Sequence, residues 1–220
     1  MTVKAPTPLR YSPSFHMHIK LGQLDIYIGL SFAVVFALGA FFSDMRIYLI
    51  SLLSALFHET VHLIALYFSG CKTAALNFSF GGVKLICPGF SYLSFDKTVF
   101  CTLSAPLGNI FAGALFYCLY ALGEKNIFLE ISAVNIFLGA VNLFPLSFLD
   151  GGRALFSFLG KRSDMLTARK ISSFVGICSL VFLFLVFFLL FLSGKYYLFF
   201  LIFFIYCVIG CIGDKDSVFT

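Results

Sequence analysis

The sequence predicts an all-α membrane protein with about six transmembrane helices and one short β-hairpin between the second and third helices. First, 60% of the 220 residues are hydrophobic and only 11% are charged, whereas soluble domains contain about 25% charged residues. Second, apolar runs close to the roughly 20 residues that cross a bilayer recur along the chain. Third, Gly81-Gly82 interrupts a stretch of alternating residues, which is typical of a hairpin. Lipid is therefore the expected solvent for most of the chain.

The predicted spans form one membrane domain. They cover residues Ile26–Phe42, Ile47–Phe68, Val99–Leu122, Ile127–Leu146, Ile171–Leu192 and Tyr196–Ile212. We expect a single domain over residues 1–220, with a core at 16–155 and two further helices at 171–212. Most of the seven cysteines lie in apolar runs, and we expect them to be buried small hydrophobic residues rather than metal ligands or disulfide partners.

The positions of the Lys and Arg residues predict the orientation in the membrane. All but three of the 15 lie in the N-terminal segment, in the loops after the second and fourth spans, or in the C-terminal tail; the exceptions are Arg46, Lys125 and Lys195. Because positive charge collects on the cytoplasmic side, both termini of this multi-pass protein are expected in the cytoplasm. The net charge of +5 then reflects topology and attraction to anionic lipid. No basic patch with interleaved aromatic residues outside the bilayer indicates nucleic-acid binding.

The predicted hairpin, residues 74–87, differs from the apolar runs around it. Residues 76–80 alternate apolar and polar side chains. We expect the hairpin on the cytoplasmic side, partly sunk into the bilayer, where such backbone is tolerated only beside protein or a water-filled cavity. Two roles remain open: its free edge holds an extended substrate by strand addition, or it only lines the cavity.

The second predicted span contains the sequence His58-Glu59-Thr60-Val61-His62. Residues four apart share a helix face, so both imidazoles can reach one metal ion, and Glu59 on the flank can accept a proton from a metal-bound water. The alternative is a chance match with buried histidines. Charged side chains inside a membrane cost roughly 2.5–3.5 kcal/mol each, and one divalent cation would account for all three residues together.

Catalytic zinc usually has three protein ligands and one water, so a third side chain is needed. His16 and His18 precede the first span and are expected to be interfacial. Glu130 is expected near the outer surface of the membrane. Asp150 lies about 30 Å further towards the inside, on the same side of the bilayer as the two histidines. Pro145 ends the fourth helix, and the two glycines after Asp150 permit a sharp turn that aims its carboxylate at the second span. The alternative is an ordinary Asp-Gly turn at the membrane surface.

Together these motifs resemble the site-2 protease family of intramembrane metalloproteases. The matching segments are His58 to His62 and Asn142 to Gly152, which read H-E-x-x-H and N-x-x-P-x-x-x-x-D-G. Phe80-Gly81-Gly82 and the segment Ala105 to Asn109 further resemble the sporulation factor IVFB branch, although Ala105 stands where Gly is usual. The resemblance extends over residues 16–155. We expect no PDZ insertion and no nucleotide-sensing module after the sixth span.

The resemblance implies a zinc metalloendopeptidase. It implies one Zn²⁺ per chain held by His58, His62 and Asp150, with Glu59 as catalytic base, although two His and one carboxylate do not exclude iron, cobalt or manganese. The implied substrate is a transmembrane or membrane-tethered protein, cleaved in regulated intramembrane proteolysis. From the charge distribution, we expect the active site near the cytoplasmic leaflet. In the sporulation branch this is a membrane-associated sigma-factor precursor. A regulatory membrane protein is a further implied partner, and no other cofactor is expected.

Asn109 and Asn142 are candidate oxyanion donors, because they are amides within membrane spans. The alternative is hydrogen bonding between helices, and the small residues Gly108, Ala112 and Gly113 would let the third span approach its neighbours. Two other functional classes compete. A metal or proton transporter also needs intramembrane His and carboxylates, but it places polar groups across both leaflets, often with internal repeats. A catalytically silent membrane binding protein would keep the fold to hold a partner, and the intact motifs argue against it.

Overall fold

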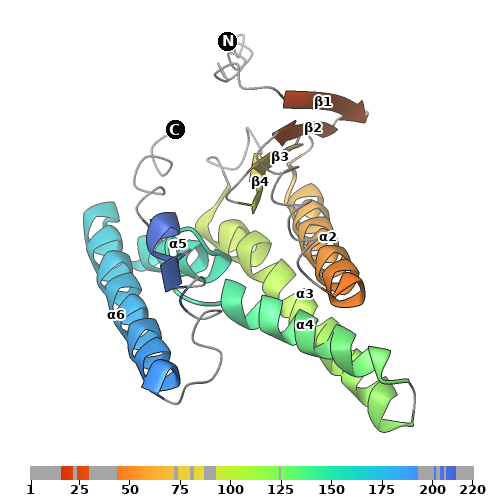
Figure 1. The fold of residues 1–220 in the computed structure, drawn as a ribbon. Coiled ribbons are helices and arrows are strands. Elements are labelled where there is room, and N and C mark those ends of the chain that lie inside the picture. The colour runs from red at the N-terminus through yellow and green to blue at the C-terminus, as the bar shows by residue number, and fades with distance from the viewer. Residues whose placement is uncertain are drawn as a thin grey trace. The chain divides into compact units, whose positions relative to one another are not determined.

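The computed structural model describes residues 16–21, 24–29, 44–71, 74–79, 82–86, 93–123, 125–192, 201, 204–205 and 207–211. The chain divides into two compact units, Met1–Leu93 and Ser94–Thr220. Among the described residues, the first unit contains four strands and one long helix, and the second contains four helices of 13 to 28 residues (Figure 1).

The first unit contains a sheet in which the strand order is β1-β2-β3-β4. The strands are β1 (His16–Leu21), β2 (Leu24–Gly29), β3 (Ala74–Ser79) and β4 (Gly82–Ile86). β1 pairs antiparallel with β2, β2 pairs parallel with β3, and β3 pairs antiparallel with β4. β3 and β4 occupy the segment in which the sequence predicts a hairpin. Because β2 covers one side of β3, the outer edge of this pair is that of β4 among the described strands.

The register of β3 and β4 corrects the predicted position of the turn. Pairing runs from Ala75 opposite Ile86 to Ser79 opposite Gly82. Gly82 therefore already belongs to β4, and the predicted Gly81-Gly82 turn is one residue too late. The connection is residues 80–81, which lie outside the described residues, and its two-residue length is the commonest one for hairpins.

Strands β1 and β2 correct the prediction for the N-terminal segment, which placed a polar region before a membrane span that begins at Ile26. The last residues of β2 are Ile26–Gly29. The β1 sequence alternates polar and apolar residues, which is a strand signal, but the apolar run that follows β2 obscured it. Residues 30–42 of the predicted first span lie outside the described residues.

Helix α2 (Met45–Phe68) carries the predicted second span, with a start two residues earlier than expected. The Asp44 side chain caps its start by accepting a hydrogen bond from the Arg46 N–H at 2.8 Å. After the helix, Gly70 has φ of 96°, and the Cys71 N–H donates to the Leu66 carbonyl at 3.0 Å. This is the left-handed glycine ending that a helix C-terminus favours, since glycine adopts positive φ without strain.

Cys71 departs from the expectation for the cysteines. It is disulfide-bonded, whereas Cys101, Cys118, Cys178, Cys207 and Cys211 are free. The expectation of no disulfide partner is therefore wrong for Cys71, although this cysteine is buried. Burial is confirmed for Cys101 and Cys207 and is wrong for Cys118 and Cys178, which are exposed.

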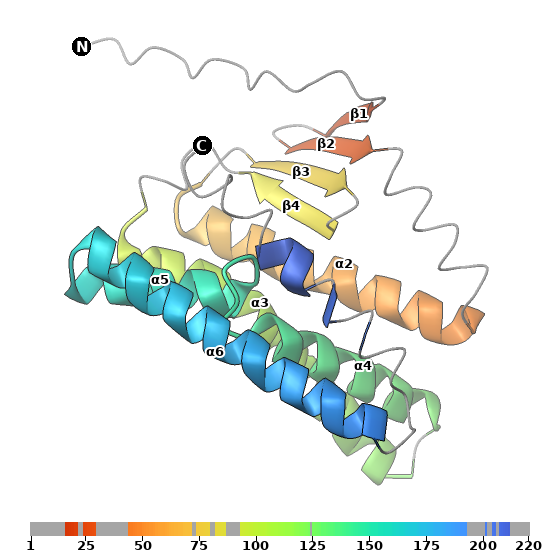
Figure 2. The ribbon, with the colours of Figure 1, turned by 60° about the vertical axis from the view of Figure 1, so that its left-hand side comes forward.

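The second unit contains α3 (Phe95–Ala121), α4 (Ile127–Asn142), α5 (Asp150–Arg162) and α6 (Met165–Leu192). Helices α3 and α4 lie side by side in both ribbon views (Figures 1 and 2). Glycines make this packing close: a Cβ on Gly113 would lie 3.0 Å from the Ser132 carbonyl oxygen, and one on Gly139 would lie 2.7 Å from that of Pro106. The predicted close approach at Gly113 is therefore confirmed.

A cluster of buried apolar residues lies at the connection between α4 and α5. Leu146, Leu149 and Cys207 are buried there. The partly buried residues around them are Val141, Phe144, Phe148, Leu180, Leu183 and Cys211. Apolar side chains from α6 thus cover the segment that leads into α5, which fixes the start of that helix in the unit.

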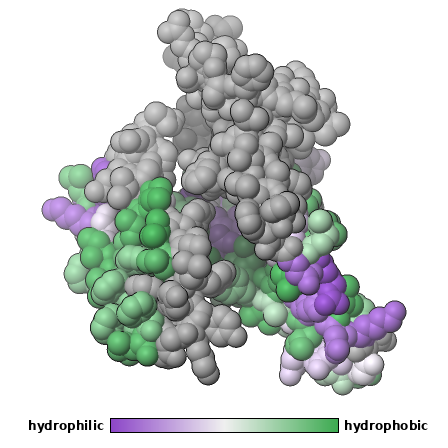
Figure 3. Space-filling view, viewed as in Figure 1, coloured by the Kyte–Doolittle hydropathy of each residue, from purple (hydrophilic) through white to green (hydrophobic). Residues whose placement is uncertain are grey.

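Three described helices are long and apolar enough to cross a membrane: α2, α3 and the Met165–Val186 part of α6. They indicate a membrane protein, and Figure 3 shows apolar residues covering the visible face of α6. Helix α4 is a shorter apolar helix that ends four residues before the predicted Leu146, because Pro145 cannot continue a helix. The sixth predicted span, Tyr196–Ile212, is described only at residues 201, 204–205 and 207–211, all helical.

Candidate metal centre

The two histidines of the H-E-x-x-H motif lie together on α2. His58 is buried and His62 is half-buried, and the two rings are 4.8 Å apart between centroids with their planes at 88°. His58 continues the buried face of the helix formed by Ile50 and Ser54. The four-residue spacing thus places both imidazoles on one face, at a separation that suits ligation of a single ion.

Glu59 follows His58 on the same turn of α2 and is half-buried. The next residue, Thr60, is exposed. Its hydroxyl donates a hydrogen bond to the Leu56 carbonyl at 2.7 Å, within its own helix. A carboxylate adjacent to a histidine pair has the position that a general base needs if a metal-bound water lies between them.

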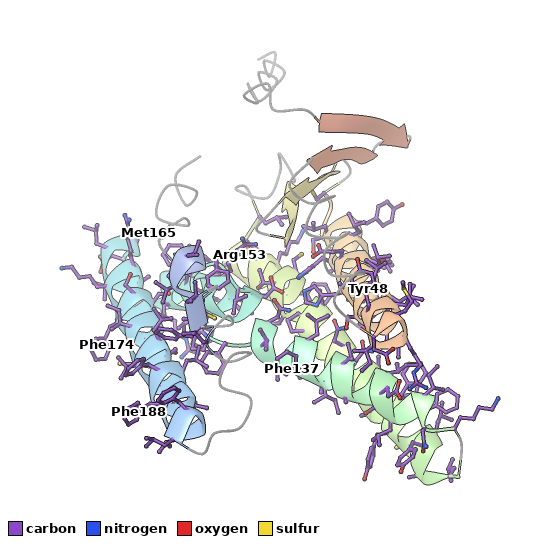
Figure 4. The ribbon with its side chains drawn as sticks, viewed as in Figure 1. Tyr48, Phe137, Arg153, Met165, Phe174 and Phe188 are labelled. Carbon is purple, nitrogen blue, oxygen red and sulfur yellow. The ribbon has the colours of Figure 1, made fainter. Side chains whose placement is uncertain are left out.

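Asp150 lies in the second unit as the first residue of α5, and it is buried. Leu149 before it has extended backbone, with φ of −95° and ψ of 162°. A carboxylate in the first turn is favoured by the positive end of the helix dipole. Arg153, which is labelled in Figure 4, follows three residues later on the same helix and is exposed.

The prediction of a sharp Asp-Gly-Gly turn after Asp150 is wrong, because these residues begin α5. The two glycines have another role. A Cβ on Gly151 would lie 2.1 Å from the Leu143 carbonyl oxygen, and one on Gly152 would lie 2.0 Å from that of Leu146. The first turn of α5 therefore packs backbone to backbone against the connection that follows α4, and no side chain fits at either position.

The two asparagines predicted as oxyanion donors have different surroundings. Asn109 is fully buried, and its Nδ2 donates to Oδ1 of Asn135 at 2.8 Å. This hydrogen bond joins α3 to α4. Asn142, at the end of α4, donates its Nδ2 to the Leu138 carbonyl at 2.9 Å. Neither hydrogen bond places its amide next to a reacting group. For Asn109, the bond to Asn135 favours the alternative role, which is hydrogen bonding between helices.

Asn135 was missed by the sequence reasoning. Its Oδ1 accepts from Asn109, and its Nδ2 donates to the Ile131 carbonyl at 2.9 Å. The available signal was an amide in the middle of an apolar helix, opposite another amide on the preceding helix. Of the other predicted residues, Glu130 lies half-buried in the first turn of α4, and His16 and His18 lie in β1.

Comparisons with known proteins identify related sequences and folds. The model of the family "Peptidase family M50" matches residues 100–186, a segment of less than half the chain that includes Asp150 but not the histidine pair. The fold is similar to that of "Site-2 Protease from Methanocaldococcus jannaschii", with a TM-score of 0.64 and 17% sequence identity over 91% of this chain and 95% of that one. No curated protein matches the chain.

Proposed function

We propose that the chain is a membrane-embedded metalloprotease, in which His58, His62 and Asp150 together hold one Zn²⁺. Two imidazoles and one carboxylate are a common catalytic zinc set that leaves a position for water. The donors fit such an ion because His58 and Asp150 are buried. Buried ionisable groups in a membrane are costly, and a bound cation is one way to stabilise them.

When bound, such a metal would supply Lewis acidity and lower the pKa of a bound water towards 7. The residues of the chain then have separate tasks. His58 and His62 orient the site from one helix face, and Asp150 completes the ligand set with a negative charge. Glu59 takes a proton from the attacking water and returns it to the leaving amine.

The proposed substrate is a transmembrane or membrane-tethered protein, as in regulated intramembrane proteolysis. A peptide bond within a helix is protected, so the substrate must unwind into extended form before cleavage. The outer edge of β4, at the end of the described sheet, is the proposed site of strand addition. Deletion of β4 is expected to abolish cleavage and to leave the zinc content unchanged.

For the oxyanion, Asn142 remains the proposed donor, since Asn109 engages Asn135. We also propose that both termini are cytoplasmic, on the charge distribution given above, with the site near the cytoplasmic leaflet. A sporulation role, on a sigma-factor-like substrate and under a regulatory membrane protein, is proposed only on the resemblance of Phe80-Gly81-Gly82 and Ala105 to Asn109.

The observation that carries this proposal is the histidine pair with Glu59 on one apolar, membrane-length helix. The Glu59→Gln variant tests it, in full-length protein co-expressed with a membrane substrate. We expect a folded, metal-loaded protein whose cleavage rate falls by about 10²–10⁴-fold, the usual contribution of a general base. Glu130→Gln is the matched control, because it neutralises another half-buried carboxylate.

Cleavage by Glu59→Gln at the parental rate would remove the assigned base. Metal transport into vesicles by the purified protein, in the absence of any proteolysis, would instead favour the transporter class. Elemental analysis of the same preparations identifies the metal and its number per chain.

A further inference from the structure

The junction between α5 and α6, residues Phe158 to Lys170, combines basic and apolar side chains on its exposed surface. The exposed basic residues are Lys161, Arg162, Arg169 and Lys170. The exposed apolar ones include Met165, at 56% exposure, and Leu166, at 72%. Met165 labels this end of α6 in Figure 4, and Figure 3 shows hydrophilic residues collected at the same end.

The charges at the junction are not all equivalent. Nζ of Lys161 lies 2.6 Å and 2.7 Å from the two carboxylate oxygens of Asp96, so this lysine is matched within the protein. The Arg162 guanidinium stands 4.4 Å above the Phe158 ring, which orients it without neutralising it. The single acid of the junction, Asp164, accepts from the Thr167 N–H at 3.0 Å and caps α6. Besides Lys161, the junction therefore exposes three cations, Arg162, Arg169 and Lys170.

The depth of these cations follows from the helix that they precede. After Lys170, α6 has no Asp, Glu, Lys or Arg as far as its end at Leu192. That apolar part is about 33 Å long at 1.5 Å per residue, against a hydrocarbon thickness of about 30 Å. If α6 spans the bilayer, Arg169 and Lys170 lie at the level of the lipid headgroups.

We propose that the α5–α6 junction binds the phosphodiester headgroups of anionic phospholipids through Arg162, Arg169 and Lys170, with Met165 and Leu166 inserted at the headgroup boundary. Guanidinium and ammonium groups are the donors that phosphate oxygens prefer. A basic cluster with exposed apolar side chains beside a membrane span is typical of anionic lipid recognition. This inference does not depend on the proposed protease activity.

A tryptophan reporter tests the proposal directly, because the chain contains no Trp. Full-length Leu166→Trp is reconstituted in bilayers of equal parts phosphatidylglycerol and phosphatidylcholine, with bromine on one lipid at a time as a quencher. Each surface cation favours anionic lipid by about 1 kcal/mol, or about fivefold. We therefore expect brominated phosphatidylglycerol to quench at least about twice as strongly as brominated phosphatidylcholine.

Charge variants in the Trp background separate a specific site from general attraction. Replacement of Arg162, Arg169 and Lys170 by Gln is expected to make the two lipids equal, whereas the charge-keeping variant with Lys, Lys and Arg keeps the preference. Lys125→Gln is the matched control, since it removes an exposed cation in the α3–α4 turn, and it is expected to keep the preference. Inorganic phosphate at constant ionic strength should not compete.

Three results would overturn the proposal. Equal quenching by both lipids in the parent reporter excludes a preference for anionic lipid. Competition by inorganic phosphate indicates a site for the free ion, and absence of quenching by either lipid indicates that the junction meets a protein rather than the bilayer. The charge-keeping variant controls for folding, because it alters the same three positions.

Discussion

At the scale of single residues, the amide pair between α3 and α4 decides between two roles for Asn109. Asn109→Ala removes the donor to Asn135, whose buried Oδ1 then loses this partner. We expect the free energy of unfolding to fall by about 1 kcal/mol, within the range measured for polar contacts between membrane helices. Cleavage measured well below the unfolding temperature should change little.

Asn142→Ala is the contrasting variant, since that amide bonds only to its own helix in the contacts described above. If Asn142 stabilises the oxyanion, its loss lowers kcat by about 10²-fold or more at nearly unchanged KM. A large kcat loss in Asn109→Ala with normal thermal stability would reverse the two assignments.

Asp164 gives a residue-scale prediction for pH dependence. Hydrogen bonds from the side chain of Thr167, and to a smaller extent from its backbone, lower the pKa of this carboxyl. Because the folded pKa lies below the unfolded value of about 4, the carboxylate stabilises the fold above that pH, and this contribution is lost as pH falls through the folded pKa.

Thermal unfolding of the parent and of Asp164→Asn between pH 7 and pH 3 measures this contribution. We expect the parent to be more stable at pH 7 and the difference to shrink below about pH 4. A constant difference across the range would show that the cap acts without its charge.

At the scale of elements, the first turn of α5 depends on two positions without side chains. Gly151→Ala and Gly152→Ala place a Cβ about 2 Å from backbone oxygens, so the helix start must shift. Both variants are expected to lose metal and activity together, as elemental analysis and cleavage assays measure. Gly176→Ala is the control, because its Cβ would lie 3.6 Å from the Pro145 oxygen in ordinary contact. Full metal occupancy in Gly152→Ala would contradict this role.

Sequence patterns predicted some elements better than others. The long apolar helices α2, α3 and α6 were found because their residues face lipid on most sides, which produces continuous apolar runs. Helix α5 was missed because its start, Asp150-Gly151-Gly152, has the composition of a turn. Its first turn packs closely against the backbone of the connection that follows α4, a contact that the local sequence does not reveal. The pairing of β2 with β3 was missed because it joins strands far apart in the sequence.

For the candidate site, spacing on one helix was enough to bring His58 and His62 together, since a helix has a fixed period. The role of Asp150 rests on a contact between distant segments, which no local pattern encodes, and it stays a prediction. The Asn109–Asn135 bond could not be assigned because the rotation of α3 against α4 follows from the packing of Gly113 and Gly139.

At the scale of the whole molecule, the proposed ligands come from both compact units. A metal held by all three should therefore stabilise the folded chain, by about 4 kcal/mol when its concentration is a thousandfold above Kd. We expect EDTA to lower the unfolding temperature of the parent, as differential scanning calorimetry measures. Asp150→Asn should already be destabilised and respond little, and Asp164→Asn is the control. An equal response in the parent and in Asp150→Asn would exclude Asp150 as a ligand.

The parallel pairing of β2 with β3 constrains on which side of a bilayer the sheet lies. Two adjacent strands of one sheet must lie on the same side of a bilayer, so β2 and β3 share one compartment. Lys20 in β1 and Lys84 in β4 then share a compartment regardless of which leaflet attracts positive charge, so a single accessibility label on either strand reports the location of both.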